Sequence, residues 1–314
     1  MGGIGHCGAV YLYAYDTAAG QSVLQSFLQP GSSGLPGSCE NGSLFGNSLA
    51  AGDFNGDGRD DLAVGVPRRN TAGQFHSGAV YVLLGSPLGI TAGGSVVVTV
   101  ENLGLTPEIE DYFRAFVASG RLDGDAVDDL IVGSPRRVVG SPVPISAGAV
   151  TIFWGAAIGS PLALALDIGP GMIGGEASEG SDGFGGGLAV ADFDGDGQSD
   201  LAISAPSESD GALTFVGVAH VVHGPVSPAS VTTAHPLIPD SGYASWPRAS
   251  HQAYGLPLVA LDLDADANAD LALAITGHDR TAVNAGLVQV LFGALFATGF
   301  ERGDPEDWTL SFAP

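Results

Sequence analysis

The sequence predicts an all-β protein, a β-propeller of which about four and a half blades are present. Three observations support this fold class. The 314-residue chain contains 49 glycines and only 14% charged residues, its apolar residues fall in short runs bounded by Gly, Pro and Asp, and these runs recur about every seventy residues. No run is long enough for a helical repeat, and the Gly-, Pro- and Ser-rich connections provide no helices for a parallel nucleotide-binding sheet.

Each repeat opens with an aromatic-led strand, continues through an acidic turn and enters a second, apolar strand. Four segments of this kind align without gaps, and they begin at Phe45, Phe113, Phe184 and Tyr254. The second strand ends in a proline in the first three segments, at Pro67, Pro135 and Pro206. In the fourth segment Thr276 stands at that position.

A Gly-led third strand follows each acidic segment. Its copies are GAVYVLLG from Gly78, GAVTIFWG from Gly148, GVAHVVHG from Gly217 and GLVQVLFG from Gly286, and a fifth copy, GAVYLYAY from Gly8, opens the chain. A weaker fourth strand, such as residues 95–100, completes a four-stranded propeller blade. We therefore expect half a blade in 1–30, blades in 44–100, 113–168, 184–238 and 254–300, and a C-terminal tail in 301–314.

The acidic turns share one spacing, with oxygen-bearing side chains at positions one, three, five and nine. Short carboxylates in this pattern, joined by the backbone carbonyl at position seven, suit a hard cation with six to eight oxygen ligands, which favours Ca²⁺. The predicted ligands are Asp53, Asn55, Asp57, Arg59 (backbone O) and Asp61; Asp192, Asp194, Asp196, Gln198 (backbone O) and Asp200; and Asp262, Asp264, Asp266, Asn268 (backbone O) and Asp270. We expect about three calcium ions; the alternative is a set of metal-free, Asp-rich turns.

The second turn departs from this pattern. Arg121 holds position one and Ala126 holds the glycine position, which leaves Asp123, Asp125 and Asp129. We expect the guanidinium to neutralise these carboxylates in place of a metal. The fourth turn has Ala267 where the others have glycine, which weakens its site if that residue is left-handed. The expected order of affinity is the third turn, the first, the fourth and last the second.

Composition excludes several functions. The formal charge is -24, from 34 acidic residues against ten arginines and no lysine. This balance opposes nucleic-acid binding and rules out a catalytic lysine or a lysine-containing phosphate loop. No apolar run approaches the roughly 18 residues needed to span a bilayer. Gly-x-Ser-x-Gly and His-Glu-x-x-His motifs are missing, so we do not expect this chain to be an enzyme; the sequence does not decide this for a longer parent protein.

Histidine and cysteine are sparse. His220 and His223 lie three apart on a predicted strand and point to opposite faces, so no metal pair is expected. Cys7 and Cys39 have no metal-ligand spacing, and either a bridge in an oxidising compartment or two free thiols agrees with the sequence. The N-terminus shows no signal-peptide pattern.

The combination of Phe45-Gly46, the acidic turn from Asp53, the Gly-x-Pro element ending at Pro67 and the strand from Gly78 resembles the FG-GAP repeat of integrin α-subunit β-propellers and their bacterial relatives. The resemblance covers residues 44–293, and residues 8–28 resemble the second half of another blade. Arg114 replaces the motif glycine in the second repeat, and the fourth repeat lacks Gly-x-Pro. The resemblance implies a calcium-stabilised extracellular propeller, usually of seven blades, that binds proteins or other ligands, most often in adhesion. Further blades would then come from missing sequence or from another chain.

Four arginines follow two of the Gly-x-Pro elements and are predicted to gather on the face opposite the acidic turns. They are Arg68, Arg69, Arg136 and Arg137. The resemblance identifies this as the ligand-facing side, which favours a site for an anionic ligand such as an acidic protein loop or an acidic glycan, with Trp246 as an exposed aromatic contact. The alternative is that these arginines pair locally with the surplus acids.

Two functions follow from these observations. The leading interpretation is a secreted or cell-surface module in which calcium is structural and the loops bind a protein or a glycan. The alternative is an accessory propeller of a larger secreted hydrolase or lyase whose catalytic part is absent from this chain.

Overall fold

The computed structural model is nearly all-β. It describes residues 6–32, 34–70, 75–99, 101, 104, 116–139, 146–156, 162–173, 180–209, 212–237, 250–276 and 286–293. The start of the second repeat at Phe113 and Arg114, the aromatic candidate Trp246 and the tail 301–314 lie outside these residues. Within them, the helical elements are short, such as η2 (Pro170–Met172) and α1 (Pro228–Thr232), and no helix has the length and apolarity to cross a membrane.

The strands form five antiparallel sheets, and in each sheet strands that follow one another in sequence lie next to one another. The first sheet is β1 (Val10–Asp16) and β2 (Gln21–Leu28). The three four-stranded sheets are β3 (Leu49–Gly52), β4 (Asp61–Val66), β5 (Ala79–Leu84) and β6 (Thr91–Val98); β7 (Phe116–Gly120), β8 (Asp129–Ser134), β9 (Ala149–Trp154) and β10 (Ala163–Ile168); and β11 (Gly187–Ala191), β12 (Asp200–Ala205), β13 (Val218–Val222) and β14 (His235–Leu237). The last sheet is β15 (Tyr254–Leu261), β16 (Asp270–Ile275) and β17 (Leu287–Leu291). This up-and-down order is that of propeller blades, so the predicted fold class is confirmed.

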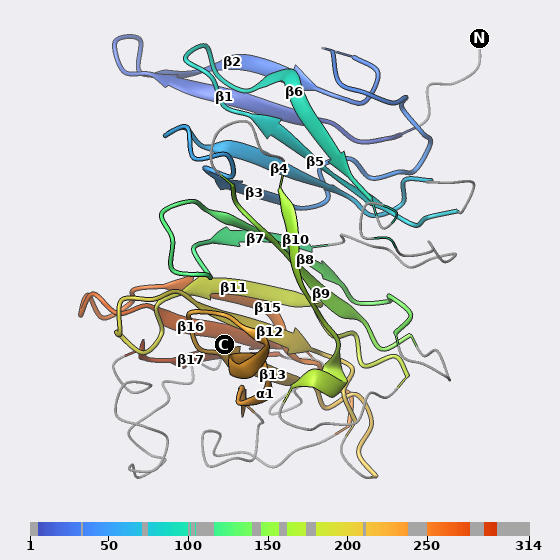
Figure 1. Cartoon of the computed structure of the whole chain (residues 1–314), viewed down its shortest axis with the longest axis vertical. Helices are drawn as coiled ribbons and strands as arrows, with labels where there is room; N and C mark the ends of the chain where they lie inside the picture. The colour runs from blue at the N-terminus through green and yellow to red at the C-terminus, as the bar shows by residue number, and fades with distance from the viewer. Residues whose placement is uncertain are drawn as a thin grey trace.

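The sheets follow one another along the long axis of the molecule in chain order (Figure 1). The β1–β2 sheet lies at one end, β3–β6 and β7–β10 come next, and the two last sheets overlap at the other end in this view. The first strands of the successive sheets contact one another, β3 with β7, β7 with β11 and β11 with β15. The described sheets therefore form an open series, with β1–β2 and β15–β17 as its ends.

The hydrophobic core lies between the sheets, because the second strand of each four-stranded sheet is buried on both faces. In β8, Leu130 and Val132 pack towards β3–β6, whereas Ile131 packs towards β11–β14. Successive side chains of a strand point to opposite faces, so a strand between two neighbouring sheets buries its central side chains on both faces. This explains the unbroken apolar runs in the sequence.

Where the structure describes it, the aromatic residue that opens a repeat is hydrogen-bonded to the residue just before the Gly-led third strand of the preceding repeat. The Phe184 N–H donates to the carbonyl of Ala147 at 2.9 Å, and the Tyr254 N–H donates to the carbonyl of Val216 at 3.0 Å. A Cβ on Gly148, which has φ +95°, would overlap the carbonyl oxygen of Phe184. The Gly-led strand thus begins with glycine because the next repeat's backbone occupies the space of a side chain.

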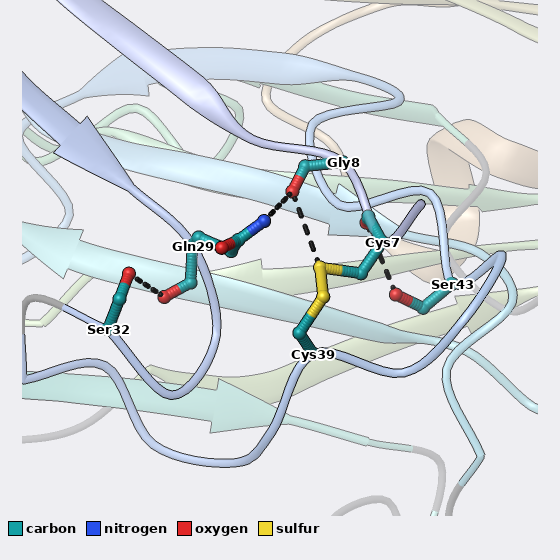
Figure 2. Close-up of a disulfide and its surroundings, with 6 residues drawn as sticks. All are labelled: Cys7, Gly8, Gln29, Ser32, Cys39 and Ser43. Carbon is teal, nitrogen blue, oxygen red and sulfur yellow. Dashed lines mark hydrogen bonds between the residues drawn. A yellow bond between two sulfur atoms is a disulfide. The ribbon is translucent and has the colours of Figure 1, made fainter. Parts of the chain in front are cut away.

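A disulfide joins Cys7 to Cys39, which settles the question left open by the sequence (Figure 2). The bridge links the segment before β1 to the loop between β2 and β3, with the two Cα atoms 5.4 Å apart. Gln29 Nε2 donates to the carbonyl of Gly8 at 3.2 Å, and Ser43 Oγ donates to the carbonyl of Cys7 at 3.3 Å. The bridge therefore fixes the start of the first sheet to the loop that leads into the next sheet.

Candidate metal turns and the opposite face

The acidic turns connect the first and second strands of their sheets, and their side chains organise the turn backbone. Oxygens at positions three and five each accept an N–H from two residues further on. In the third turn, Asp196 N–H donates to Asp194 Oδ1 at 3.1 Å and Gln198 N–H donates to Asp196 Oδ1 at 2.7 Å. The second turn keeps these bonds through Asp123 and Asp125, so its backbone is held in the same way at these positions.

Position one separates the second turn from the others. In the third turn, Asp192 accepts the N–H groups of Gly195, Asp196 and Gly197 at 2.7 to 3.1 Å. Asp53 and Asp262 accept N–H groups of their own turns in the same manner. A guanidinium accepts no hydrogen bond, so Arg121 cannot replace this carboxylate.

Position six of each turn, where the first and third turns have glycine, tests whether the backbone there is left-handed. Gly58 and Gly197 have φ of 81° and 88°, and Ala267 has φ of 75°, so the fourth turn places an alanine in the left-handed region. Ala265 also has a positive φ, 61°. Each of these alanines adds strain of about 1–2 kcal/mol to the fourth turn. Ala126 does not take a positive φ, so the second turn differs there too.

Position nine carries a buried aspartate in all four turns, and both carboxylate oxygens accept backbone N–H groups. One bond comes from position two of the same turn and the other from the glycine that ends the third strand, with all eight distances between 2.7 and 3.2 Å. The aspartates are Asp61, Asp129, Asp200 and Asp270, and the partner glycines are Gly85, Gly155, Gly224 and Gly293. This residue therefore connects the turn to the third strand whether or not a metal is bound.

Burial makes the charged form of Asp61 and Asp129 less favourable. It raises the pKa of Asp61, and it raises the pKa of Asp129 to about 6, against the opposing effect of the two N–H groups that each carboxylate accepts. In the third turn, burial and then the nearby charge of Asp200 raise the pKa of Asp194. A bound cation would offset this desolvation and repulsion.

Three groups of side chains in the described residues bring ligand atoms within 4.8 Å of one another. They are Asp192, Asp194 and Asp196; Asp262, Asp264 and Asp270; and Asp194, Asp200 and His223. The first turn forms no such group, and there Asn55 stands in place of a carboxylate and donates from Nδ2 to Asp61 Oδ1 at 3.3 Å. The donor sets of the third and fourth turns fit a hard cation, with carboxylate oxygens concentrated on an exposed turn.

His223 was not among the predicted site residues, although it lies beside the third turn. Its Nδ1 is 3.1 Å from Asp194 Oδ2 and 3.4 Å from Asp200 Oδ1, and the hydrogen bond with Asp200 raises the pKa of the imidazole. His220, on the opposite face of β13, is buried against Phe184. The sequence did contain a signal for this contact. His223 directly precedes Gly224, and the pairing of β12 with β13 places the residue before that glycine opposite position nine of the turn.

Arg121 forms its described ion pair with Asp128, at position eight of its own turn, and not with Asp123, Asp125 or Asp129 as the sequence suggested. Its Nε lies 3.3 Å from Asp128 Oδ1, and the other oxygen of Asp128 accepts the N–H of Asp53 at 2.9 Å. The Asp128 N–H in turn donates to the carbonyl of Asp53 at 3.0 Å. The arginine therefore pairs with the residue that joins the second turn to the first.

The structure does not bring the four predicted arginines together as a ligand surface. Arg137 is buried, and both of its Nη atoms bond the carboxylate of Asp167, at 2.5 and 2.6 Å. The reason is the pairing of β9 with β10, which places Asp167 opposite Thr151, a second partner of Arg137. Arg69 lies over the ring of Tyr81, 5.2 Å from its centroid. These two guanidinium groups are held within their own sheets.

Arg68 and Arg136 remain exposed on the side of the Gly-x-Pro elements. Arg136 borders a cavity of about 360 Å³ that is also lined by Phe116, Pro135, Ser146 and Leu256, among other residues. The cavity lies where the loops after β8 and β12 approach β7 and β15. This part of the predicted surface thus has a concave site with the cationic side chain of Arg136 at its wall.

Comparison with known proteins agrees with this repeat architecture. The FG-GAP repeat family matches residues 45–83 and 184–222, which contain β3, β4, all of β5 but its last residue, and β11–β13. The chain is 33% identical over 167 residues to phosphatidylinositol-glycan-specific phospholipase D of Rattus norvegicus, covering 50% of this chain and 18% of that protein. It is 34% identical over 189 residues to integrin alpha-PS2 of Drosophila melanogaster, covering 55% of this chain and 12% of the integrin. Human integrin alpha-7 is 39% identical over 93 residues, 29% of this chain and 7% of that protein. The chain thus spans less than a fifth of the length of these relatives.

Proposed function

Since the chain carries FG-GAP repeats in an all-β structure of propeller-type sheets, we propose that it is an extracellular interaction module whose acidic turns bind about three calcium ions. The observation that carries this proposal is the third turn. There, Asp192, Asp194 and Asp196 place carboxylate oxygens within 4.8 Å of one another while backbone N–H groups fix their orientation. The disulfide supports an oxidising, extracellular location, because such bridges are rare in reducing compartments.

Calcium has a structural role in this proposal. Each turn concentrates three or four carboxylates that repel one another, and a cation bound by the folded turn alone stabilises the folded chain. At a free calcium concentration a hundredfold above the dissociation constant, each site adds about 2.7 kcal/mol to the free energy of unfolding. Loss of calcium should therefore lower the thermal midpoint without changing the sheet architecture.

Equilibrium dialysis with calcium tests the number and order of sites. We expect about three ions, with the third turn tightest and the second turn empty. Replacing Asp194→Asn should weaken one site, because it removes a charged ligand, whereas Asp123→Asn in the second turn is the matched control and should leave the count unchanged. Four tight sites, or none, would contradict the proposal.

The proposed binding surface for a protein or glycan lies on the Gly-x-Pro side, around the cavity bordered by Arg136. An exposed arginine beside a concave site favours an anionic group. Acidic glycans and matrix proteins should be screened against the chain with and without a chelator. Binding that weakens in Arg68→Ala/Arg136→Ala but not in Arg121→Ala, in the turn expected to stay free of metal, would support this surface. If the double variant binds the ligand as well as the control variant does, the proposed surface is wrong.

A second candidate function is an accessory propeller of a larger secreted hydrolase or lyase. It is favoured by the similarity to phosphatidylinositol-glycan-specific phospholipase D from several organisms, of which this chain covers 18–22% in the mammalian proteins. Sequencing the gene beyond both ends of the chain distinguishes the two candidates. A catalytic domain in the same reading frame supports the accessory role, and additional repeats alone support the interaction module.

A further inference from the structure

The first sheet exposes an aromatic face. Tyr11, Tyr13 and Tyr15 alternate along β1, and their side chains are 55%, 62% and 66% exposed. The strand register places Phe27 opposite Tyr11 and Leu24 opposite Tyr13, so these apolar side chains share the face. The other face of the sheet is the one that packs against β3–β6. An exposed apolar surface of this kind marks an interaction site.

The repeats show what covers this face elsewhere in the molecule. Aligned on the Gly-led strand, Tyr11 and Tyr13 correspond to four pairs of residues that are at most 5% exposed. These pairs are Tyr81 and Leu83, Thr151 and Phe153, His220 and Val222, and Gln289 and Leu291. In each case the face is turned towards the preceding sheet, as Tyr81 and Leu83 are towards β1–β2. The aromatic face of β1–β2 is therefore half of a sheet-to-sheet interface.

The last sheet, β15–β17, exposes part of the surface that forms the other side of such a sheet-to-sheet interface. Val259 and Val288, on the outward face of β15–β17, are 49% and 47% exposed, while Val290 beside them is buried. The residues that correspond to Val288 in the three preceding sheets are fully buried against the next sheet. They are Val80, Val150 and Ala219. Both ends of the series thus expose apolar side chains at positions that are buried against a neighbouring sheet elsewhere in the chain.

We propose that a second copy of this chain docks the outward face of its β15–β17 sheet on the aromatic face of β1–β2. The contact continues, between molecules, the packing that each chain makes between its own successive sheets. It is a head-to-tail contact, which forms a closed ring if the rotation between copies closes and a growing chain if it does not. The net charge of -24 opposes association at long range, so salt that screens this repulsion favours the contact. This inference is independent of the proposed calcium and ligand sites.

The experiment is sedimentation velocity on the full chain in about 0.15 M salt, with concentration varied from about 1 to 200 µM. We expect the wild type to associate as its concentration rises. Tyr13→Asp and Val288→Asp should each weaken association at least tenfold, roughly, because each places an unpaired carboxylate in an apolar contact. Leu88→Asp, on a turn where the leucine is 97% exposed, is the matched control and should associate as the wild type does.

A mixture of the two variants makes the test specific for a head-to-tail contact. An equimolar mixture retains one intact pair of surfaces, Tyr13 of one variant and Val288 of the other, and should form a dimer that does not grow. A wild type that stays monomeric throughout, a mixture that does not dimerise, or association lost in Tyr13→Asp but kept in Val288→Asp would overturn the proposal. Circular dichroism and the urea midpoint establish that each variant is folded, and Tyr13→Ser and Val288→Ser replace any variant that is not.

Discussion

Replacing Gly148 with alanine tests the attachment of one repeat to the next. The new Cβ would overlap the carbonyl oxygen of Phe184 and lie 2.8 Å from its nitrogen and 3.0 Å from the carbonyl oxygen of Pro135. All three atoms belong to the backbone, so the sheets themselves must move apart. A side chain at φ +95° adds about 1–2 kcal/mol of strain, and overpacking adds about 1–3 kcal/mol. We expect the free energy of unfolding to fall by about 2–5 kcal/mol.

Urea unfolding followed by tryptophan fluorescence measures this loss, because Trp154 packs partly buried in the same sheet. Gly169→Ala is the matched control. Gly169 has φ of -100°, and among the described residues no atom outside its chain neighbours lies within 4 Å of the place that a Cβ would take. Alanine there should be neutral or stabilise the chain by up to about 1 kcal/mol. Equal midpoints for the two variants would refute the reasoning that close backbone approach requires glycine at the start of the third strand.

Three further predictions concern the disulfide, a buried acid and a buried ion pair. Replacing both cysteines with serine removes the bridge, which closes a span of 32 residues. This change should lower the free energy of unfolding by about 3–4 kcal/mol in urea titrations, and an unchanged midpoint would contradict the prediction. Burial raises the pKa of Asp129 to about 6, above the ordinary value of 3.8, so at pH values between these two the folded chain binds a proton that the unfolded chain does not. The free energy of unfolding should therefore rise as pH falls from about 6 to about 4, by up to roughly 3 kcal/mol. Asp129→Asn should lack this part of the pH dependence, and identical pH profiles would disprove the assignment. Arg137→Met leaves Asp167 without its bidentate partner and should lower the free energy of unfolding by about 2 kcal/mol in urea titrations. The loss should be smaller than for a fully buried pair because Asp167 is partly exposed, and an unchanged midpoint would contradict this.

The sheets could be predicted from the sequence because the signals that form them are local. Turn residues, the repeated glycine before the third strand and the aromatic residue at the start of the first strand recur in order, and they indicate where each strand begins and ends. The left-handed conformation of Ala267 was also accessible, since its neighbours at that position in the first and third turns are glycines.

The interactions that the sequence did not predict depend on strand register and on distance in space. Arg137 is 30 residues from Asp167, and only the pairing of β9 with β10 brings them together. Whether Cys7 and Cys39 meet depends in the same way on how β1–β2 packs on the next sheet. His223 lies beside Asp200 because the end of the third strand returns to the turn. The metal ligands themselves stay predictions that calcium binding must test.

The buried aspartate at position nine connects each acidic turn to the third strand, whereas the carboxylate at position one, where present, accepts N–H groups within the turn itself. Asp129 holds the second turn to the end of β9 through two N–H groups, although Arg121 has replaced the carboxylate at position one. The second repeat therefore keeps its place in the series of sheets without the position-one carboxylate. The attachment of a turn to the third strand of its sheet does not require the full set of oxygen ligands that a cation would need.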